Sequence, residues 1–241
     1  NFSIPCFWAY SFAGSLGYTP SLFDTKIDAQ TNGPVTTFLS LAKTKVIEKP
    51  KDYNRDTMTQ IAEKYSQQAI SINNNRQNDL TDSTVVMILS ETFSDPTRIP
   101  GISLSTDPIP NIHAIKDTST SGLMLSSGYG GGTANMEYQA LTGLSLSIFD
   151  DSLIIPFQQL VPNQKNPYAF NQIWNNRYGA DGSDAVHPYY QSMYLRNVDY
   201  KKFCFSHLRH LYRTTYINHK DNIDYLPILR HEDAFKNIIY L

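Results

Sequence analysis

Apolar residues recur at a three-and-four spacing in two stretches near the start of the chain, which is typical of one face of a helix. The first stretch begins at Asn32-Gly-Pro34, with proline in the first turn, and ends before Pro50. The second carries its apolar stripe from Met58 to Ala69. We interpret both predicted helices as structural. The polar run 73–79 then predicts a loop and a boundary between a helical lead-in, residues 1–80, and a main domain, residues 81–241.

A continuous apolar run opens the predicted main domain. Thr84–Leu89 has the length and the β-branched start of a strand that is buried on both faces. Glu91 follows directly, at the edge where the sheets of α/β proteins bind their ligands. A surface charge at a strand end is the alternative for Glu91. Both interpretations stay open on the pattern alone.

Further elements are predicted along the rest of the chain. We expect one or two short strands between Ile112 and Leu125, and a helix from Asn171 that ends at Gly179. Another short strand is predicted at Asp184–His187, leading into the segment that contains Arg196. The mixture of helices and strands predicts an α/β fold with a central sheet flanked by helices.

The densest group of glycines in the chain lies between Ser126 and Gly143 and runs directly into a helix-like pattern. Glycines 128 and 130–132 allow positive φ angles and close approach of a ligand to the backbone. Thr133 falls on the first turn of the predicted helix, where free N–H groups and the helix dipole favour an anion. We interpret Thr133 as a nucleophile. The alternative is a flexible loop before an ordinary helix.

Composition narrows the classes of protein and of partner. An apolar content of 41% and a charged content of 17% indicate a globular chain. The formal charge of −2 gives no argument for a nucleic-acid partner. Two cysteines, Cys6 and Cys204, cannot form a disulfide framework, and no apolar run is long enough to span a membrane. The aromatic, uncharged residues 1–20 favour a position beside a membrane surface.

Glu91, Thr133, His187 and Arg196 are expected at one edge of the sheet, around an anionic group. Carboxylate and hydroxyl oxygens suit Mg²⁺ or Mn²⁺, which would activate the hydroxyl of Thr133. Arg196 can bind a phosphate through two nitrogens, and His187 can donate a hydrogen bond or carry a proton. The sequence contains no G-x-S-x-G elbow, no P-loop and no H-E-x-x-H motif.

Four segments, in order, resemble one family. They are residues 85–95, the Gly-Gly-Gly-Thr-Ala-Asn-x-Glu pattern around Thr133, Leu141-Thr-Gly143, and the His-Pro-Tyr-x-x-x-Met-Tyr-x-Arg pattern from His187 to Arg196. Together they resemble the sulfatase-like phosphoglycerol transferases of the alkaline phosphatase superfamily, which include the lipoteichoic acid synthases. The resemblance extends from about residue 20 to residue 225.

The resemblance implies an alkaline-phosphatase-like α/β domain outside a Gram-positive-type cell, tethered by membrane helices. It implies that Thr133 attacks phosphatidylglycerol, releases diacylglycerol and holds glycerol phosphate until an acceptor takes it. The resemblance further implies that the acceptor is a glycerol-phosphate polymer, a glycolipid or another glycan. By position, Glu91 and Thr133 match ligands of a Mn²⁺ ion, and His187 and Arg196 match contacts to glycerol phosphate. Tyr194 replaces a tryptophan and Tyr189 replaces an acidic residue, so the head group can differ.

One departure concerns the metal site. The family completes it with an Asp-His pair on a later strand, and this sequence contains no Asp-His dipeptide. We therefore expect that the catalytic domain is incomplete at its C-terminal end, and that these 241 residues alone bind the metal weakly and have little activity. The alternatives are a phosphoethanolamine transferase or another phosphodiester enzyme of the superfamily, and a non-catalytic domain that binds the polymer.

Overall fold

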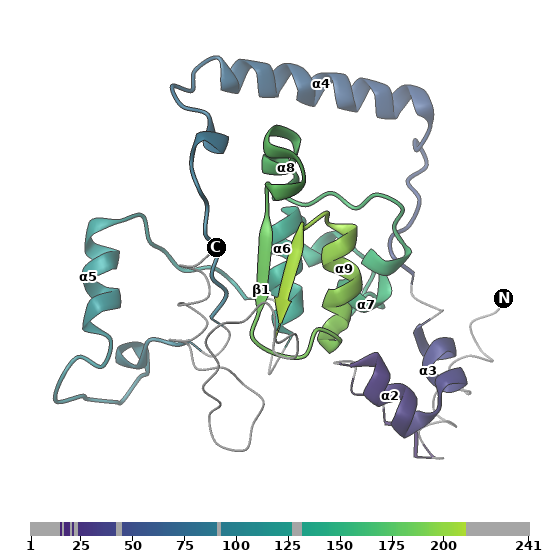
Figure 1. Ribbon diagram of the computed structural model, residues 1–241, viewed down its shortest axis with the longest axis horizontal. Coiled ribbons are helices and arrows are strands. Elements are labelled where there is room, and N and C mark those ends of the chain that lie inside the picture. Colours follow the sequence, from purple (N-terminus) through teal and green to yellow (C-terminus); the bar gives the residue numbers. More distant parts are fainter. Residues whose placement is uncertain are drawn as a thin grey trace.

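The computed structural model of the chain describes residues 15, 17–19, 21, 24–41, 45–90, 93–126 and 132–210. Within these ranges the protein is mostly helical, with one small parallel sheet (Figure 1). The elements are α2 (Thr25–Asn32), α3 (Pro34–Leu41), α4 (Arg55–Asn73), η1 (Leu80–Asp82), η2 (Pro96–Arg98), α5 (Pro110–Thr118), α6 (Thr133–Thr142), η3 (Leu146–Ile148), α7 (Pro156–Gln159), η4 (Val161–Asn163), α8 (Gln172–Tyr178), η5 (Gly179–Asp181), β1 (Asp184–His187), η6 (Met193–Leu195), α9 (Arg196–Lys202) and β2 (His207–His210). No helix of the described residues is both long and apolar enough to cross a membrane.

Helices α2 and α3 occupy the start of the chain. The Asp24 side chain accepts hydrogen bonds from the backbone of Lys26 and Ile27, which caps α2. Gly33, with φ of 85°, separates α2 from α3, and Pro34 begins α3 as the sequence predicts. The predicted end before Pro50 is wrong, because α3 ends at Leu41 and residues 45–50 are not helical. The Ser192 hydroxyl donates to Asp24 Oδ2 at 2.9 Å, so this cap also ties the lead-in to η6.

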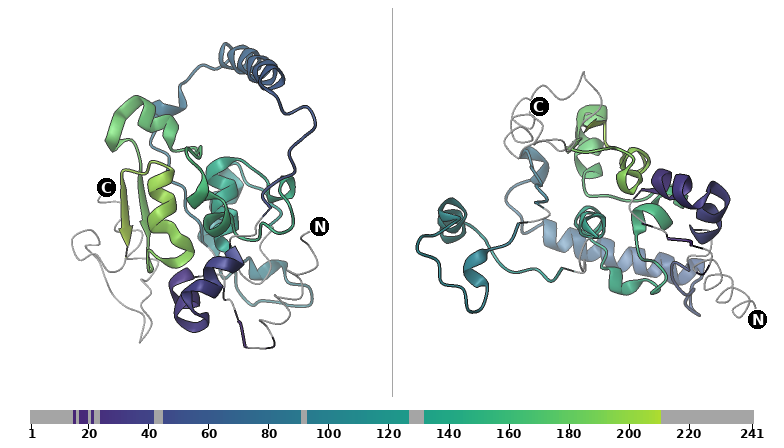
Figure 2. Two further views of the ribbon diagram at one scale, coloured as in Figure 1. Left: turned by 90° about the vertical axis from the view of Figure 1, so that its right-hand side faces the viewer. Right: turned by 90° about the horizontal axis from the view of Figure 1, so that it is seen from below.

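Helix α4 confirms the second predicted helix, but its apolar stripe is not covered by the described residues. Asn54 caps the helix through the Thr57 N–H group. None of the residues of α4 is buried, and Ile61 and Tyr65 are both exposed. In Figure 1 and in the left view of Figure 2, α4 lies apart from the other helices. The spacing of apolar residues therefore predicted the helix correctly. No other described part of the chain packs against its apolar stripe.

Two of the predicted strands are wrong. Thr84–Leu89 is extended but forms no strand, and Val85–Leu89 are between 43% and 56% exposed instead of buried. A strand requires a neighbour to pair its N–H and C=O groups, and no described segment lies against this run in a ladder. Between Ile112 and Leu125 the structure contains α5 instead of a strand. Pro110 starts this helix, because its fixed φ suits the first helical turn.

The core is formed by α6, α7, η4 and α9. Tyr138, Phe157 and Phe203 are at most 1% exposed. The Phe157 ring meets the edge of Tyr138 at 6.3 Å and lies 6.0 Å from Phe203. Aromatic contacts of this kind stabilise beyond the area they bury, by about 1 kcal/mol each. The core therefore fixes α6 relative to α9, the two helices that carry Thr133 and Arg196.

Strands β1 and β2 pair in parallel, with Asp184 opposite His207 and His187 opposite His210. They lie side by side next to α9 (Figures 1 and 2). β1 confirms the predicted strand at Asp184–His187, and α8 confirms the predicted helix, ending at Gly179 with φ of 71°. Of the expected central sheet, the described residues contain these two parallel strands, and the run at 84–89 is not paired with them.

Candidate functional site

Thr133 begins α6, as the glycine pattern predicts. Gly132 precedes it in the left-handed conformation, with φ of 84°, and no side chain caps the helix. A left-handed residue at this point favours glycine, because a Cβ atom would crowd the following carbonyl group. The start of α6 therefore offers N–H groups and the positive end of the helix dipole beside a hydroxyl. Glu91 and glycines 128, 130 and 131 lie outside the described residues.

Glu137 lies four residues after Thr133 and binds the guanidinium group of Arg196. Arg196 Nη2 donates to Glu137 Oε2 at 2.6 Å, and Nε donates to Oε1 and Oε2 at 3.2 Å and 3.0 Å. The side chains are 5% and 11% exposed. A planar, two-point contact of this kind is the strongest form of ion pair between side chains. Arg196 is thus attached to the helix that begins with Thr133.

His187 ends β1 beside the same guanidinium group. Its Nε2 atom lies 3.5 Å from Arg196 Nη1, at the long limit of a hydrogen bond. Burial and then the charge of Arg196 lower the pKa of His187 to about 3, against a backbone hydrogen bond with Tyr190 that raises it. His187 is therefore neutral at physiological pH, and the cation of the site is Arg196.

Two acidic groups of α9 complete this buried cluster. Asp199 is fully buried, and neither carboxylate oxygen has a hydrogen-bond partner. Burial and then the charge of Glu137 raise the pKa of Asp199 to about 9, so the group is protonated at pH 7. The Tyr200 hydroxyl donates to Glu137 Oε1, and burial raises the pKa of Tyr200. The formal charges that remain are those of Glu137 and Arg196, which offset each other.

Tyr194 and Tyr189 lie close to this cluster. Tyr194 is 4% exposed, and the guanidinium carbon of Arg196 lies 5.2 Å from the centre of its ring. Tyr194 and Leu195 have positive φ angles of 56° and 57°, which turn the chain sharply into α9. The Tyr189 ring meets the edge of His187 at 6.4 Å. The structure therefore gathers the four residues predicted to bind substrate, and their roles remain predictions.

The metal prediction rests on one described residue. Thr133 is described and Glu91 is not, and across the described ranges no three His, Cys, Asp or Glu side chains form a group suited to a metal ion. The donor types, a carboxylate and a hydroxyl, suit Mn²⁺ or Mg²⁺. His207 bonds to Asp184 at 2.8 Å, and His210 is buried.

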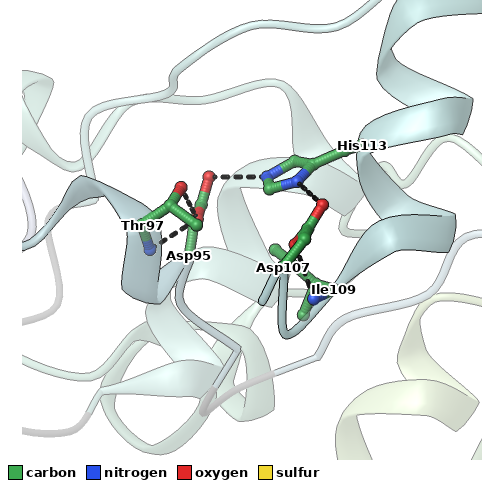
Figure 3. Close-up of polar contacts among 5 residues, drawn as sticks. All are labelled: Asp95, Thr97, Asp107, Ile109 and His113. Carbon is green, nitrogen blue, oxygen red and sulfur yellow. Dashed lines mark hydrogen bonds and ion pairs between the residues drawn. The ribbon is translucent and has the colours of Figure 1, made fainter. Parts of the chain in front are cut away.

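A second polar cluster, missed by the sequence analysis, lies at α5 (Figure 3). His113 Nδ1 lies 2.7 Å from Asp107 Oδ2, and Nε2 lies 3.2 Å from Asp95 Oδ2. Thr97 and Ile109 donate to the same two carboxylates. The bonds to Asp107 and Asp95 raise the pKa of His113, and bonds from Thr97 and His113 hold the pKa of Asp95 at about 2. His113 thus joins two segments that precede the glycine stretch.

Glu137, Asp199 and Tyr200 were also missed. The pattern Gly-Gly-Gly-Thr-Ala-Asn-x-Glu contains Glu137, and its spacing of four from Thr133 places both on one face of a helix. This was the available signal.

Comparison with known proteins identifies the family. A model of the sulfatase family matches residues 83–236, more than half of the chain. The protein belongs to the sulfatase family. This confirms the resemblance to sulfatase-like enzymes, and it assigns a sulfatase-like fold by homology.

The Streptococcus pyogenes phosphoglycerol transferase GacH, solved in complex with sn-glycerol-1-phosphate, is similar to this sulfatase-family chain. The two share 34% sequence identity with a TM-score of 0.74, over 81% of this chain and 50% of GacH. A putative cyclic β-1,2-glucan modification protein of Rhizobium meliloti is 35% identical over 127 residues. That match covers 52% of this chain and 18% of the relative. The chain thus spans half or less of the length of these relatives.

Proposed function

We propose that this chain belongs to a phosphoglycerol transferase that acts on the outer face of a Gram-positive-type cell membrane. It would move glycerol phosphate from phosphatidylglycerol to an acceptor through a covalent Thr133 intermediate. The observation that carries the proposal is the connection between Thr133, at the start of α6, and Arg196, which Glu137 binds one turn further along the same helix. Similarity to GacH supports it.

The reaction consists of two displacements at one phosphorus atom. The Thr133 oxygen forms a bond to phosphorus, and the bond from phosphorus to the diacylglycerol oxygen breaks. Diacylglycerol leaves with the proton of the Thr133 hydroxyl. The acceptor hydroxyl then forms a bond to phosphorus, breaks the bond to Thr133 and returns a proton to it. Glu91 and Thr133 are the residues that would hold Mn²⁺ or Mg²⁺, which lowers the pKa of a bound hydroxyl.

Arg196 and His187 would act on the charge of the phosphodiester. The Nε edge of Arg196 is bound by Glu137, so an anion would approach from the side of Nη1, which faces His187 and donates to the Met193 carbonyl oxygen. His187 is neutral, so Arg196 would supply the positive charge that the transition state requires, with His187 beside it. Tyr194 and Tyr189, which surround these two residues, would contact the head group.

The acceptor that we favour is a glycan, with a lipoteichoic-acid-type polymer as the alternative. The support is the name of the Rhizobium meliloti relative, a putative glucan modification protein. Membrane helices elsewhere in the full-length protein would hold the site near its lipid donor. A tyrosine at position 189, where the family has an acidic residue, favours a changed contact with the head group.

Turnover by the full-length protein tests the proposal. Phosphatidylglycerol with labelled acyl chains is incubated with the wild-type protein, with Thr133→Ala and with Thr142→Ala, a matched change at the other end of α6. We expect release of diacylglycerol by the wild type and by Thr142→Ala, and none by Thr133→Ala. Normal turnover by Thr133→Ala would overturn the proposal. Turnover of phosphatidylethanolamine instead of phosphatidylglycerol would assign the phosphoethanolamine transferase alternative.

A further inference from the structure

We propose that Glu137 is a positioning residue that holds Arg196 at a fixed place relative to Thr133. The inference deepens the proposed function, because it adds a residue to the same site. The Glu137 carboxylate binds Arg196 and Tyr200. It acts through the guanidinium group that it binds.

The argument begins with the geometry of α6. Thr133 and Glu137 are four residues apart in one helix, so both lie on the same face with a rise of about 6 Å between them. The helix is fixed by its buried residues Ala134 and Tyr138. A group bound in two places by Glu137 therefore has a defined position relative to the start of the helix.

The second step concerns the freedom of Arg196. A long arginine side chain has many rotamers, and ordering it costs free energy at the moment a ligand binds. Here Nε and Nη2 bond to Glu137, and Nη1 donates to the Met193 carbonyl oxygen at 3.2 Å. The guanidinium is thus oriented in advance. Charges that are already oriented stabilise a transition state without reorganising.

The third step concerns charge and the support of Glu137 itself. Glu137 offsets the charge of Arg196 in a buried place, where an unpaired cation would be strongly unfavourable. The Tyr200 hydroxyl donates to the other oxygen of Glu137, and this fixes the carboxylate in turn. Asp199 is buried beside the pair without a hydrogen-bond partner and adds no competing bond.

The test uses the full-length protein with Glu137→Gln, Glu137→Asp, Arg196→Met and the double variant Glu137→Gln/Arg196→Met. Asp82→Asn is the matched control, because it removes the carboxylate from the exposed Arg177 ion pair at η1. The measurements are kcat and KM for phosphatidylglycerol, the affinity for inorganic phosphate by calorimetry, and the midpoint of unfolding. Rates are compared under conditions well below the midpoint of unfolding, and only variants that are folded there are included.

We expect Glu137→Gln to lower kcat/KM about 100-fold, the loss typical of a misplaced reacting group. The double variant should be no less active than Arg196→Met, since Glu137 acts only through Arg196. Glu137→Asp keeps the charge and should recover part of the loss, and Asp82→Asn should stay within about twofold of the wild type. Losses that multiply in the double variant, or full activity of Glu137→Gln, would overturn the inference. If Glu137→Gln does not fold, an unchanged kcat/KM of Glu137→Asp would also overturn the inference.

Phosphate binding separates this inference from the proposed function. A wild-type protein that binds inorganic phosphate and does not turn over phosphatidylglycerol contradicts the proposed function alone. In that case Glu137→Gln should still weaken phosphate binding by about tenfold or more, which is the size of the loss of one charge-assisted hydrogen bond to phosphate. Equal phosphate affinity of the wild type and Glu137→Gln would overturn the role of Glu137 whatever the donor.

Discussion

Glu137 Oε2 lies 2.6 Å from Arg196 Nη2, in a contact that joins residues 59 positions apart in the sequence. The pair connects α6 to α9, and Glu137 lies one helical turn after Thr133. His187, Tyr194 and Tyr200 surround it. The contact therefore contributes both to the stability of the core and to the proposed chemistry.

Loss of Arg196 should destabilise the protein. Arg196→Met leaves the buried Glu137 carboxylate unpaired, and breaking a buried pair in this way costs about 3–5 kcal/mol. Arg177→Met breaks an ion pair with Asp82 whose side chains are 42% and 58% exposed, and should cost about 1 kcal/mol or less. Unfolding by denaturant measures both. Equal losses of stability would contradict the buried pairing.

The pH dependence of stability should reveal His187 and Asp199. The pKa of His187 in the folded protein, about 3, lies below the usual 6.5, so its contribution to stability falls as pH decreases through that range. The pKa of Asp199, about 9, lies above the usual 3.8, so its contribution falls as pH rises from 3.8 to 9. Between pH 3.8 and 6.5 these two changes of the free energy of unfolding with pH have opposite signs and cancel. Above pH 6.5 only the fall due to Asp199 remains.

Asp199→Asn should remove this slope. Between pH 7 and pH 8.5 the free energy of unfolding of the wild type should fall relative to that of the variant, by about 1 kcal/mol per pH unit. Denaturant unfolding of both proteins at several pH values provides the measurement. Parallel pH profiles would show that Asp199 is ionised in the folded protein.

His113 should titrate above its usual pKa. Hydrogen bonds to Asp107 and then Asp95 favour its protonated form, so this contribution to stability is present below pH 6.5 and is lost as pH rises through the raised pKa. Asp95, with a pKa of about 2, contributes above its usual 3.8 and loses this contribution in stronger acid. NMR titration should give a lower pKa for His113 in Asp107→Asn than in the wild type. Asp117→Asn, on the same helix, is the control and should leave it unchanged.

Gly132 should be sensitive to substitution. Its φ of 84° requires a left-handed backbone, so Gly132→Ala should destabilise the protein by about 1–2 kcal/mol and lower turnover by moving Thr133. Gly122 has no positive φ and no heavy atom within 4 Å of an added Cβ. Gly122→Ala should therefore change stability little, and thermal unfolding compares the two. A Gly132→Ala protein as stable as Gly122→Ala would contradict the assigned backbone.

The elements that the sequence predicted correctly depend on local chemistry. Pro34 at the start of α3, the periodic stripe of α4 and the glycines beside α6 and α8 act within a few residues of themselves. The run Thr84–Leu89 shows the limit of this reasoning. Its apolar character predicted a strand, but a strand depends on a partner, which the run itself does not specify.

In the candidate site, too, local sequence signals predicted some features, whereas others depend on how the chain packs. Thr133, His187 and Arg196 could be selected because their residue types and neighbours carry a chemical signal. The contact between Glu137 and Arg196 could not, since it depends on how α6 and α9 pack around Phe157 and Phe203. The neutral state of His187 likewise follows from burial, which residue type alone does not reveal.

Mass spectrometry of Thr133 tests the central proposal most directly. The full-length protein is mixed with phosphatidylglycerol without an acceptor, quenched and digested, and the peptide that contains Thr133 is compared with the same peptide of Arg196→Met. We expect a wild-type peptide heavier by one glycerol phosphate on Thr133, and much less of it in the variant. An unmodified Thr133 in a protein that releases diacylglycerol, or a glycerol phosphate on another residue, would contradict the assignment.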